Sequence, residues 1–166
     1  ILDGMIGNEL ILNGDDDKLI TIEEVNGKKP IFFGRKNTHV IYSGECQNLG
    51  LAGSEVVIHR EGRAFSASVP LPGEHMIDNA LAATAVATVL GLSDEEIQRG
   101  IAAVQPVGGR SHIIKEEKVT IIDDCYNANP VSMKAAVDLL TTANSRTVAI
   151  LGDMFELGSN EVALHY

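Results

Sequence analysis

A strand that ends in a polar turn and leads into a well-capped helix constrains the second half of this 166-residue sequence. Residues 119–122 are apolar and rich in β-branched side chains, as is typical of a buried strand in a parallel sheet. Asn129 suits the N-cap of a helix, and Pro130 suits its first position. Apolar side chains then recur with helical spacing at Met133, Ala136, Val137 and Leu140.

A second apolar run at residues 147–151 follows this helix, so the segment predicts a right-handed βαβ unit with parallel strands. Polar turns at residues 123–129 and 152–158 then lie at the carboxyl edge of the sheet, where ligands bind. The first turn holds two acids, two amides and a tyrosine, which is more polarity than a helix cap needs. A capped helix without a ligand is the alternative that the spacing leaves open. The turn lacks a glycine-rich loop, so it is not a pyrophosphate cradle.

Bulk composition argues against several classes of function. The net charge is −10 and only 4% of residues are aromatic, with no tryptophan, so we expect no nucleic-acid binding. The sequence has no apolar run of about 18 residues, and we expect no membrane span. Cys46 and Cys125 are too few for a disulfide framework, and no Cys/His spacing indicates a metal site. An acidic protein can still bind a nucleotide locally, through helix ends and single cationic side chains.

Short apolar runs in the first half predict five strands, at residues 10–13, 30–34, 40–46, 55–60 and 64–69. Clear alternation at residues 65–69 favours a meander appended to a parallel sheet. The acidic turn at residues 15–17 either holds a cation or caps the next helix, and the helix dipole favours capping.

Two helices are predicted after the meander. The first runs from about residue 74 to 90, is dense in alanine, and has Gly91 in its C-terminal cap. Residues 93–96 form a capping box that opens the second, which continues to about residue 103.

A glycine-containing linker at residues 106–109 divides the chain, because it follows a helix and precedes a new strand pattern. We therefore expect one domain over residues 1–107 and a second over residues 108–166. Within the second, residues 111–114 and 118–122 predict a hairpin around two glutamates.

Four segments of the sequence carry distinctive motifs, at residues 12–16, 71–83, 124–133 and 151–158. Together they resemble signature motifs of the Mur ligase family, in its D-alanyl-D-alanine-adding MurF branch. Residues 124–133 (DCYNANPVSM) resemble Asp-(Ser/Cys)-Tyr-Asn-Ala-Asn-Pro-x-Ser-Met, and residues 151–158 resemble Leu-Gly-Asp-Met-x-Glu-Leu-Gly. Residues 71–83 are similar to the Gly-x-His-Asn-x-x-Asn-Ala-x-Ala-Ala element, and residues 12–16 to Leu-Asn-x-Asp-Asp. The motifs occur in family order and span nearly the whole chain. Met76 departs from the pattern, since many relatives have Asn there.

The resemblance implies an α/β fold in two parts. Residues 1–107 are expected to be the later part of the central ATPase domain, a mostly parallel sheet with an antiparallel meander. Residues 108–166 are expected to be the first part of a Rossmann-like C-terminal domain. The implied activity is an ATP-driven amide ligation, through an acyl phosphate, that joins D-alanyl-D-alanine to the UDP-MurNAc-tripeptide. The resemblance also implies Mg²⁺, a cytoplasmic location and a monomeric parent enzyme.

The phosphate loop that this chemistry needs, Gly-x-x-Gly-Lys-(Ser/Thr), does not occur in the sequence. In the family it lies upstream, with the magnesium-binding glutamate and a modified lysine. Residues 1–7 resemble the end of a helix, so we expect the chain to be a piece that begins inside the central domain. We expect no catalytic residue and no Mg²⁺ ligand within it, and no activity of the piece alone.

The resemblance implies ATP contacts at six positions, namely His75, Asn79, Arg110, Asp124, Tyr126 and Asn127. It also places four residues on the D-alanyl-D-alanine side, namely Asn129, Asp153, Met154 and Glu156. Met76 cannot offer the hydrogen bonds of an amide, so a second adenine contact must come from elsewhere.

Four of these positions have a simpler structural explanation. His75 and Asn79 lie on one helix face, where they could serve only capping and packing. Arg110 could be a solvated surface side chain rather than a fork for phosphate or ribose oxygens. Asp124 could cap a helix rather than accept from ribose hydroxyls, with Asp123 pointing to the other side. Cys125 has no base nearby in sequence and is expected to be unreactive.

Two other functions remain as alternatives. One is another ligase of the same superfamily, such as a cyanophycin-synthetase-like or tripeptide-forming enzyme. The run from Tyr126 to Pro130 argues against it, because those relatives carry other residues after the aspartate. The other is a non-catalytic nucleotide-binding or interaction module, which a start within a helix argues against.

Overall fold

A five-stranded mixed sheet forms the first part of the protein, whose computed structural model describes residues 9–165. The strands lie in sequence order: β1 (Ile11–Asn13), β2 (Ile31–Gly34), β3 (Ile41–Asn48), β4 (Ser54–Arg60) and β5 (Arg63–Val69). Pairing is parallel from β1 to β3 and antiparallel from β3 to β5. The expected parallel sheet with an appended meander is confirmed. The helix end predicted at residues 1–7 lies outside the described residues.

The link between β2 and β3 is unusually short for a parallel pair, which normally needs a crossover of about a dozen residues. Six residues, 35–40, suffice here because only Phe33 with Ile41 and Gly34 with Tyr42 are paired. β3 thus starts beside the end of β2 and continues beyond it. The link therefore stays at the carboxyl edge of the parallel strands.

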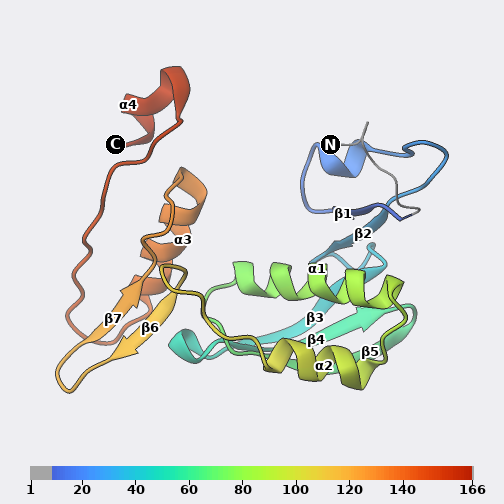
Figure 1. The fold of residues 1–166 in the computed structure, drawn as a ribbon, viewed down its shortest axis with the longest axis horizontal. Coiled ribbons are helices and arrows are strands. Elements are labelled where there is room, and N and C mark those ends of the chain that lie inside the picture. Colours follow the sequence, from blue (N-terminus) through green and yellow to red (C-terminus); the bar gives the residue numbers. More distant parts are fainter. Residues whose placement is uncertain (1–8, 166) are drawn as a thin grey trace.

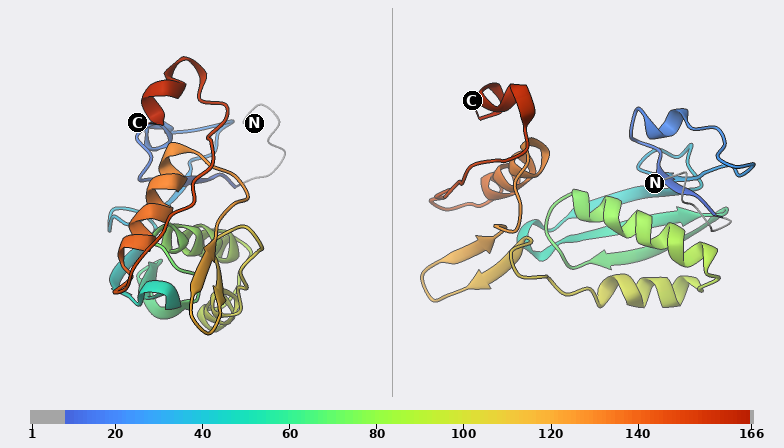
Figure 2. Two further views of the ribbon diagram at one scale, coloured as in Figure 1. Left: turned by 90° about the vertical axis from the view of Figure 1, so that its left-hand side faces the viewer. Right: turned by 45° about the horizontal axis from the view of Figure 1, so that its top comes forward.

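Two helices cover the same face of this sheet, α1 (His75–Val89) and α2 (Asp94–Ala102) (Figures 1 and 2). α1 ends as predicted at Gly91, whose φ of 79° lets the N–H of Leu92 reach the carbonyl of Ala87 at 3.0 Å. α2 begins as predicted with a capping box between Ser93 and Glu96.

The main core lies between the two helices and the sheet. Its fully buried members include Ile41, Ile58, Leu81 and Ala85. Since these residues come from β3, β4 and α1, their burial fixes the position of α1 over the sheet.

The second part contains a hairpin of β6 (His112–Lys115) and β7 (Thr120–Asp123), followed by α3 (Pro130–Thr141). The hairpin is where the sequence predicts it. Asn129 is the N-cap of α3 and Pro130 its first residue, as predicted. Four short helices complete the described elements: η2 (Leu19–Thr21), η3 (Gly50–Ala52), η4 (Gly158–Asn160) and α4 (Glu161–Leu164).

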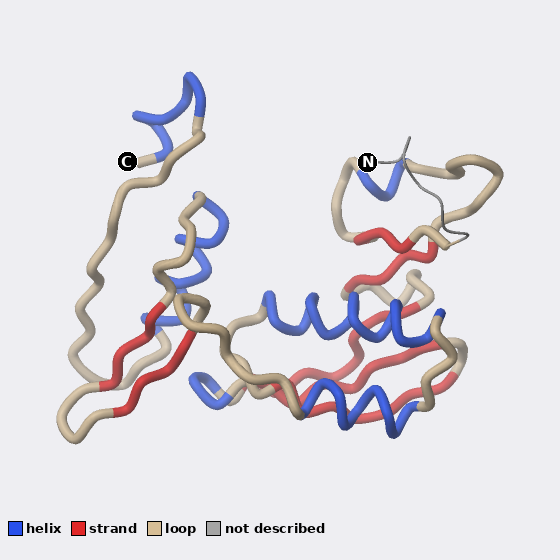
Figure 3. The backbone as a smooth tube through the Cα atoms, in the orientation of Figure 1, coloured by secondary structure: helices blue, strands red, loops and turns tan. Residues whose placement is uncertain are grey.

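The strand expected at residues 147–151 is not formed, so the predicted parallel βαβ unit is wrong for the described chain. The tube in Figure 3 runs through this segment as irregular chain, and Ile150 is 96% exposed. A strand needs a neighbour that accepts and donates its backbone hydrogen bonds. β7 pairs with β6, and the 147–151 segment pairs with no strand among residues 9–165.

Of the helices within residues 9–165, none combines the length and the apolar character needed to cross a membrane.

Candidate functional site

Backbone and carboxylate hydrogen bonds tie the linker to the turn after β7. The Gly109 N–H donates to Oδ2 of Asp123 at 3.1 Å, and the Ser111 N–H donates to Oδ1 of Asp124 at 2.8 Å. The Tyr126 N–H donates to the Gly109 carbonyl oxygen at 2.9 Å. The expectation that Asp123 points away from Asp124 was wrong, because both carboxylates bind the same three-residue segment.

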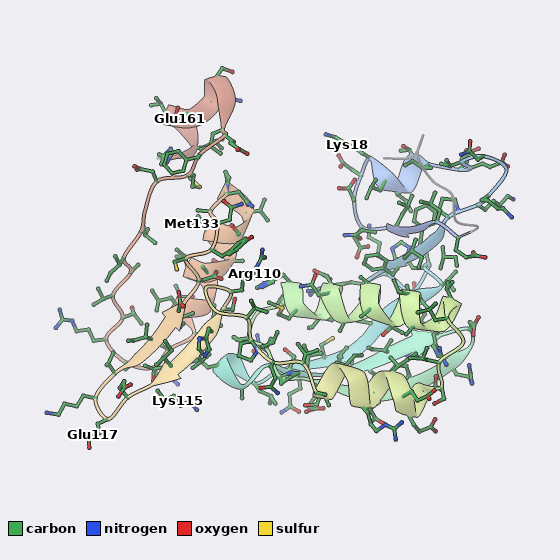
Figure 4. The ribbon with its side chains drawn as sticks, viewed as in Figure 1. Lys18, Arg110, Lys115, Glu117, Met133 and Glu161 are labelled. Carbon is green, nitrogen blue, oxygen red and sulfur yellow. The ribbon has the colours of Figure 1, made fainter. Side chains whose placement is uncertain are left out.

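Arg110 lies at the centre of this arrangement, in the link that precedes β6 (Figure 4). Its guanidinium carbon is 4.1 Å from the centroid of the Tyr126 ring, in cation–π range. The residues on either side, Gly109 and Ser111, have φ of 74° and 48°. A Cβ on Gly109 would meet the Cβ of Tyr126 at 3.3 Å, so the close approach favours glycine. Arg110 is exposed, and the face of the Tyr126 ring orients its guanidinium.

Cys125 and Asp123 are neighbours in the same turn, and each shifts the pKa of the other. Interaction with the Asp123 carboxylate is the main cause that raises the pKa of Cys125. Interaction with the Cys125 thiol, followed by the hydrogen bond from the Gly109 amide, lowers the pKa of Asp123. A raised thiol pKa disfavours the thiolate, which supports the prediction that Cys125 is not a nucleophile.

The amides of the turn serve the start of α3. The Ser132 N–H donates to Oδ1 of Asn129 at 2.9 Å, and the Asn129 N–H donates to Oγ of Ser132 at 3.1 Å. Oδ1 of Asn127 accepts from the N–H of Ala128 at 2.9 Å. Asn129 therefore caps α3 as expected, and its NH₂ group donates no hydrogen bond to another residue in the range 9–165.

His75 and Asn79 occupy the first two turns of α1. Gly73 has φ of 100°, and a Cβ there would come within 2.6 Å of the His75 ring, so that glycine makes room for the imidazole. Nδ2 of Asn79 points at Sδ of Met76 at 3.5 Å. Both Asn79 and Met76 line a cavity of about 150 Å³ between α1, α2 and the end of β5.

This cavity suits one face of a planar base. Its walls are mostly apolar side chains, including Leu71, Ala83 and Val104, while Asn79 supplies an amide with both a donor and an acceptor. The adenine of ATP has this combination of an apolar ring and a hydrogen-bonding edge. The arrangement therefore fits the base that the sequence predicts.

The predicted dipeptide-facing residues have unequal exposure. Met154 is 6% exposed, and its N–H donates to Nε2 of His165 at 3.0 Å. Asp153 and Glu156 are exposed, and Glu156 has φ of 62°. Met154 thus packs inward and fixes its loop, whereas Asp153 and Glu156 can reach a ligand.

The predicted site residues form three groups: the start of α1, the linker with the turn after β7, and the 153–156 loop. Among the described residues, no hydrogen bond or ion pair joins one group to another. Nor does any group of three or more His, Cys, Asp or Glu side chains in residues 9–165 match a metal site.

The sequence interpretation missed an arginine beside the start of α1. Nε of Arg35 donates to Oδ1 of Asp78 at 2.7 Å, and NH1 donates to Oε2 of Glu74 at 3.1 Å. The bond to Asp78 is the largest cause of a raised Arg35 pKa. The position of Arg35, directly after a strand predicted to end at the ligand edge, was the signal that could have identified it.

The acidic turn after β1 acts through two of its residues. Oδ1 of Asp16 accepts from the N–H groups of Lys18 and Leu19 at the start of η2, although the N-cap residue itself, Lys18, makes no side-chain cap. Asp15 instead accepts from the Arg35 amide at 2.5 Å and pairs with Nε2 of His39 at 3.0 Å. The turn therefore fixes the β2–β3 link rather than a cation.

Comparisons with known proteins agree on one family. The Mur ligase middle domain matches residues 2–87, and the Mur ligase, glutamate ligase domain matches residues 109–166. Relatives named UDP-N-acetylmuramoyl-tripeptide–D-alanyl-D-alanine ligase include one from Treponema pallidum, 48% identical over 118 residues, 70% of this chain and 25% of that protein. Another, from Mycobacterium tuberculosis H37Rv, is 31% identical over 164 residues, 94% of this chain and 32% of that one.

Solved structures give the same result. A crystal structure of MurF from Acinetobacter baumannii has a TM-score of 0.90 and 30% identity, covering 99% of this chain and 36% of that one. MurF from Thermotoga maritima, in complex with ADP, has a TM-score of 0.78 at 22% identity, covering 93% of this chain and 35% of that one, and shows likeness of fold. The chain spans roughly a quarter to a third of the length of these relatives.

Proposed function

Because the chain belongs to the Mur ligase family, we propose that it is part of an ATP-dependent ligase that adds D-alanyl-D-alanine to the UDP-MurNAc-tripeptide. Residues 1–107 supply the later part of the central ATP-binding domain, and residues 108–166 supply the first part of the C-terminal domain. The observation that carries the proposal is the turn at residues 124–130, whose acid and tyrosine orient the linker arginine.

The nucleotide contacts follow from the three groups of residues. Asn79 meets the edge of adenine at the cavity between α1 and α2, with His75 one turn earlier on the same helix. Arg110 offers its fork to phosphate or ribose oxygens. Asp124 uses Oδ1 for the Ser111 amide, which leaves Oδ2 to accept from a ribose hydroxyl. Tyr126 holds Arg110, and Asn127 offers its NH₂ group beside it.

The dipeptide side is proposed at the start of α3 and the 153–156 loop. Asn129 presents its NH₂ group, and Asp153 and Glu156 present carboxylates that match the dipeptide ammonium. The buried side chain of Met154 anchors the loop.

The proposed reaction transfers the γ-phosphoryl group of ATP to the tripeptide carboxylate. The amine of D-alanyl-D-alanine then attacks the acyl carbon and releases phosphate. When bound, Mg²⁺ would supply neutralisation of the phosphate charge. The residues described in this chain bind and orient, and we assign no catalytic group and no Mg²⁺ ligand among them. A cytoplasmic, monomeric parent enzyme is part of the same proposal.

The D-alanyl-D-alanine-adding branch is favoured over other ligases of the superfamily. The 2,6-diaminopimelate ligase structure has a TM-score of 0.63 at 19% identity, against 0.90 at 30% for MurF. The lower values indicate a shared fold only.

A steady-state assay of the full-length protein tests this proposal. We expect phosphate release that requires ATP, Mg²⁺, UDP-MurNAc-tripeptide and D-alanyl-D-alanine together. Omitting the dipeptide, or replacing it with diaminopimelate or D-glutamate, is the matched control. Turnover with one of the single amino acids would favour another branch, and ATP binding without any turnover would favour a non-catalytic module.

A further inference from the structure

Every nitrogen of the Arg35 guanidinium donates a hydrogen bond to the start of α1. Nε and NH2 bind the two carboxylate oxygens of Asp78 at 2.7 and 3.3 Å, a bidentate fork. NH1 binds Oε2 of Glu74 at 3.1 Å, and NH2 also donates to the Glu74 carbonyl oxygen. The Arg35 side chain is 34% exposed, and those of Glu74 and Asp78 are 74% and 40% exposed, so the bidentate geometry rather than burial distinguishes this contact from an ordinary surface ion pair.

The backbone of Arg35 is also held in place, by residues at the ends of β1 and β2. Its backbone N–H donates to Oδ2 of Asp15 at 2.5 Å, and Oδ1 of Asp15 pairs with the buried His39 ring at 3.0 Å. The His39 ring lies where Cβ atoms on Gly14 and Gly34 would stand, at 2.5 and 2.8 Å. The ends of β1 and β2 therefore hold the Arg35 backbone in one place.

These contacts hold the first turns of α1 at the ends of β1 and β2, while the buried Leu81 and Ala85 hold the rest of the helix on the sheet. Glu74 and Asp78 are four residues apart, and without a cation between them two like charges at this spacing repel each other. Asn79, the next residue after Asp78, lines the cavity between α1 and α2, whereas Arg35 binds at the opposite side of the helix, from the ends of the parallel strands. When Arg35 binds one side of α1, it fixes the rotation of the helix about its own axis. That rotation decides where the opposite side, which carries Asn79, faces.

We propose that Arg35 is a positioning residue for base recognition: by clamping Glu74 and Asp78, it sets the rotation of α1 that places the Asn79 amide at the edge of the adenine. The proposal deepens the proposed function and depends on it. The substrate class it concerns is an adenine nucleotide, and Arg35 does not contact that nucleotide.

Discrimination between ATP and GTP in the full-length protein is the informative measurement. Because a misplaced hydrogen-bonding group loses much of its effect, Arg35→Met should raise the Kd for ATP by roughly ten-fold. The Kd for GTP, which does not present the adenine edge, should change little. Arg35→Lys keeps the charge but loses the fork, and it should restore only part of the preference for ATP.

A double-mutant cycle with Asn79→Ala tests whether Arg35 acts through that amide. Once Asn79 is removed, Arg35→Met should cause little further loss of ATP affinity, so the two effects should not add. Arg63→Met is the matched control, because Arg63 is 58% exposed and its two ion pairs measure 3.7 and 3.9 Å. It should leave the preference for ATP unchanged.

The outcomes separate the two proposals. If the unaltered protein shows no preference for ATP over GTP, the proposed nucleotide site fails, and the role of Arg35 fails with it. If that preference exists and Arg35→Met retains it, or if its effect adds fully to that of Asn79→Ala, Arg35 has only a structural role. Should Arg35→Met not fold, Asp78→Asn removes the charged half of the fork and must show the same loss of preference.

Discussion

The guanidinium carbon of Arg110 lies 4.1 Å from the centroid of the Tyr126 ring, although the two residues are on opposite sides of the β6–β7 hairpin in sequence. The Tyr126 backbone reinforces this proximity through its hydrogen bond to Gly109. The relationship gives the tyrosine of the turn a role: it holds the arginine of the linker. That role leads to the first prediction.

Replacing Tyr126 should weaken ATP binding only when the ring is lost. Tyr126→Leu removes a cation–π contact worth about 0.5–1 kcal/mol at an exposed site, so ATP affinity should fall a few-fold. Tyr126→Phe keeps the ring face and should bind ATP normally. Titration of both full-length variants with ATP checks this. Equal losses in both would indicate that the hydroxyl, rather than the ring, contacts the ligand.

Arg110→Ala should cost more than Arg110→Lys. A charge-assisted hydrogen bond is worth about 1.5–3 kcal/mol, which predicts a ten- to hundred-fold rise in the KM for ATP in the alanine variant. Lysine retains the charge without the fork, so its loss should be smaller. Steady-state kinetics with varied ATP concentration measures both variants. Unchanged kinetics in Arg110→Ala would show that Arg110 is a surface side chain that does not contact ATP.

The linker glycines should differ in their tolerance of substitution. Gly109 has φ of 74°, which costs other residues about 1–2 kcal/mol, and a Cβ there also approaches Tyr126. Gly109→Ala should therefore lower the melting temperature and ATP affinity together. Gly108→Ala is the control, since a Cβ at Gly108 meets no atom within 4 Å. Equal melting temperatures for the two variants would contradict the conclusion that close contact between Gly109 and the turn after β7 stabilises the protein.

Proline at position 109 is a poor probe of this linker. Proline at position 109 would remove the N–H that binds Asp123, and it cannot adopt positive φ. The rigid-body movement of residues 1–107 against 108–166, which we predict from the glycine-containing linker, is better tested with Gly108→Pro alone. Lower turnover with both domains folded is the expected result, and wild-type turnover would place the hinge elsewhere.

Acid should destabilise the protein partly through Asp15. Burial raises the pKa of this carboxyl, but hydrogen bonds from the Arg35 amide and His39 outweigh burial, and the net pKa lies below its ordinary value of 3.8. Its stabilisation is therefore complete above about pH 4 and is lost as the pH falls through the lowered pKa. Melting temperatures between pH 7 and pH 3 should decline less steeply in Asp15→Asn than in the unaltered protein. Parallel declines would show that Asp15 is not responsible.

Local patterns predicted the fold well wherever local forces decide it. The capping box at Ser93, the N-cap at Asn129 and the glycine after α1 depend on neighbours within a few residues, and all three occur where expected. The strand at residues 147–151 was wrong because pairing depends on a distant neighbour that a local apolar run cannot report.

The candidate site was predictable to a similar extent. The motif at residues 124–130 indicated which residues gather after β7, but not that Asp123 and Asp124 bind the linker backbone. Arg35 was missed because its partners, Glu74 and Asp78, lie about forty residues away along the chain. Long-range ion pairs of this kind have no sequence period that could reveal them.

Asp124→Asn tests the central claim, that the turn after β7 binds a nucleotide, most directly. Asparagine can keep the acceptor that holds the Ser111 amide, and it is as good a cap as aspartate, so the fold should be preserved. It loses the negative charge and the second acceptor oxygen available to a ribose. ATP affinity of the full-length protein should therefore fall by about 1.5–3 kcal/mol, with a melting temperature close to that of the unaltered protein. Unchanged ATP affinity at a preserved melting temperature would show that Asp124 only joins the turn to the linker, and would contradict the account.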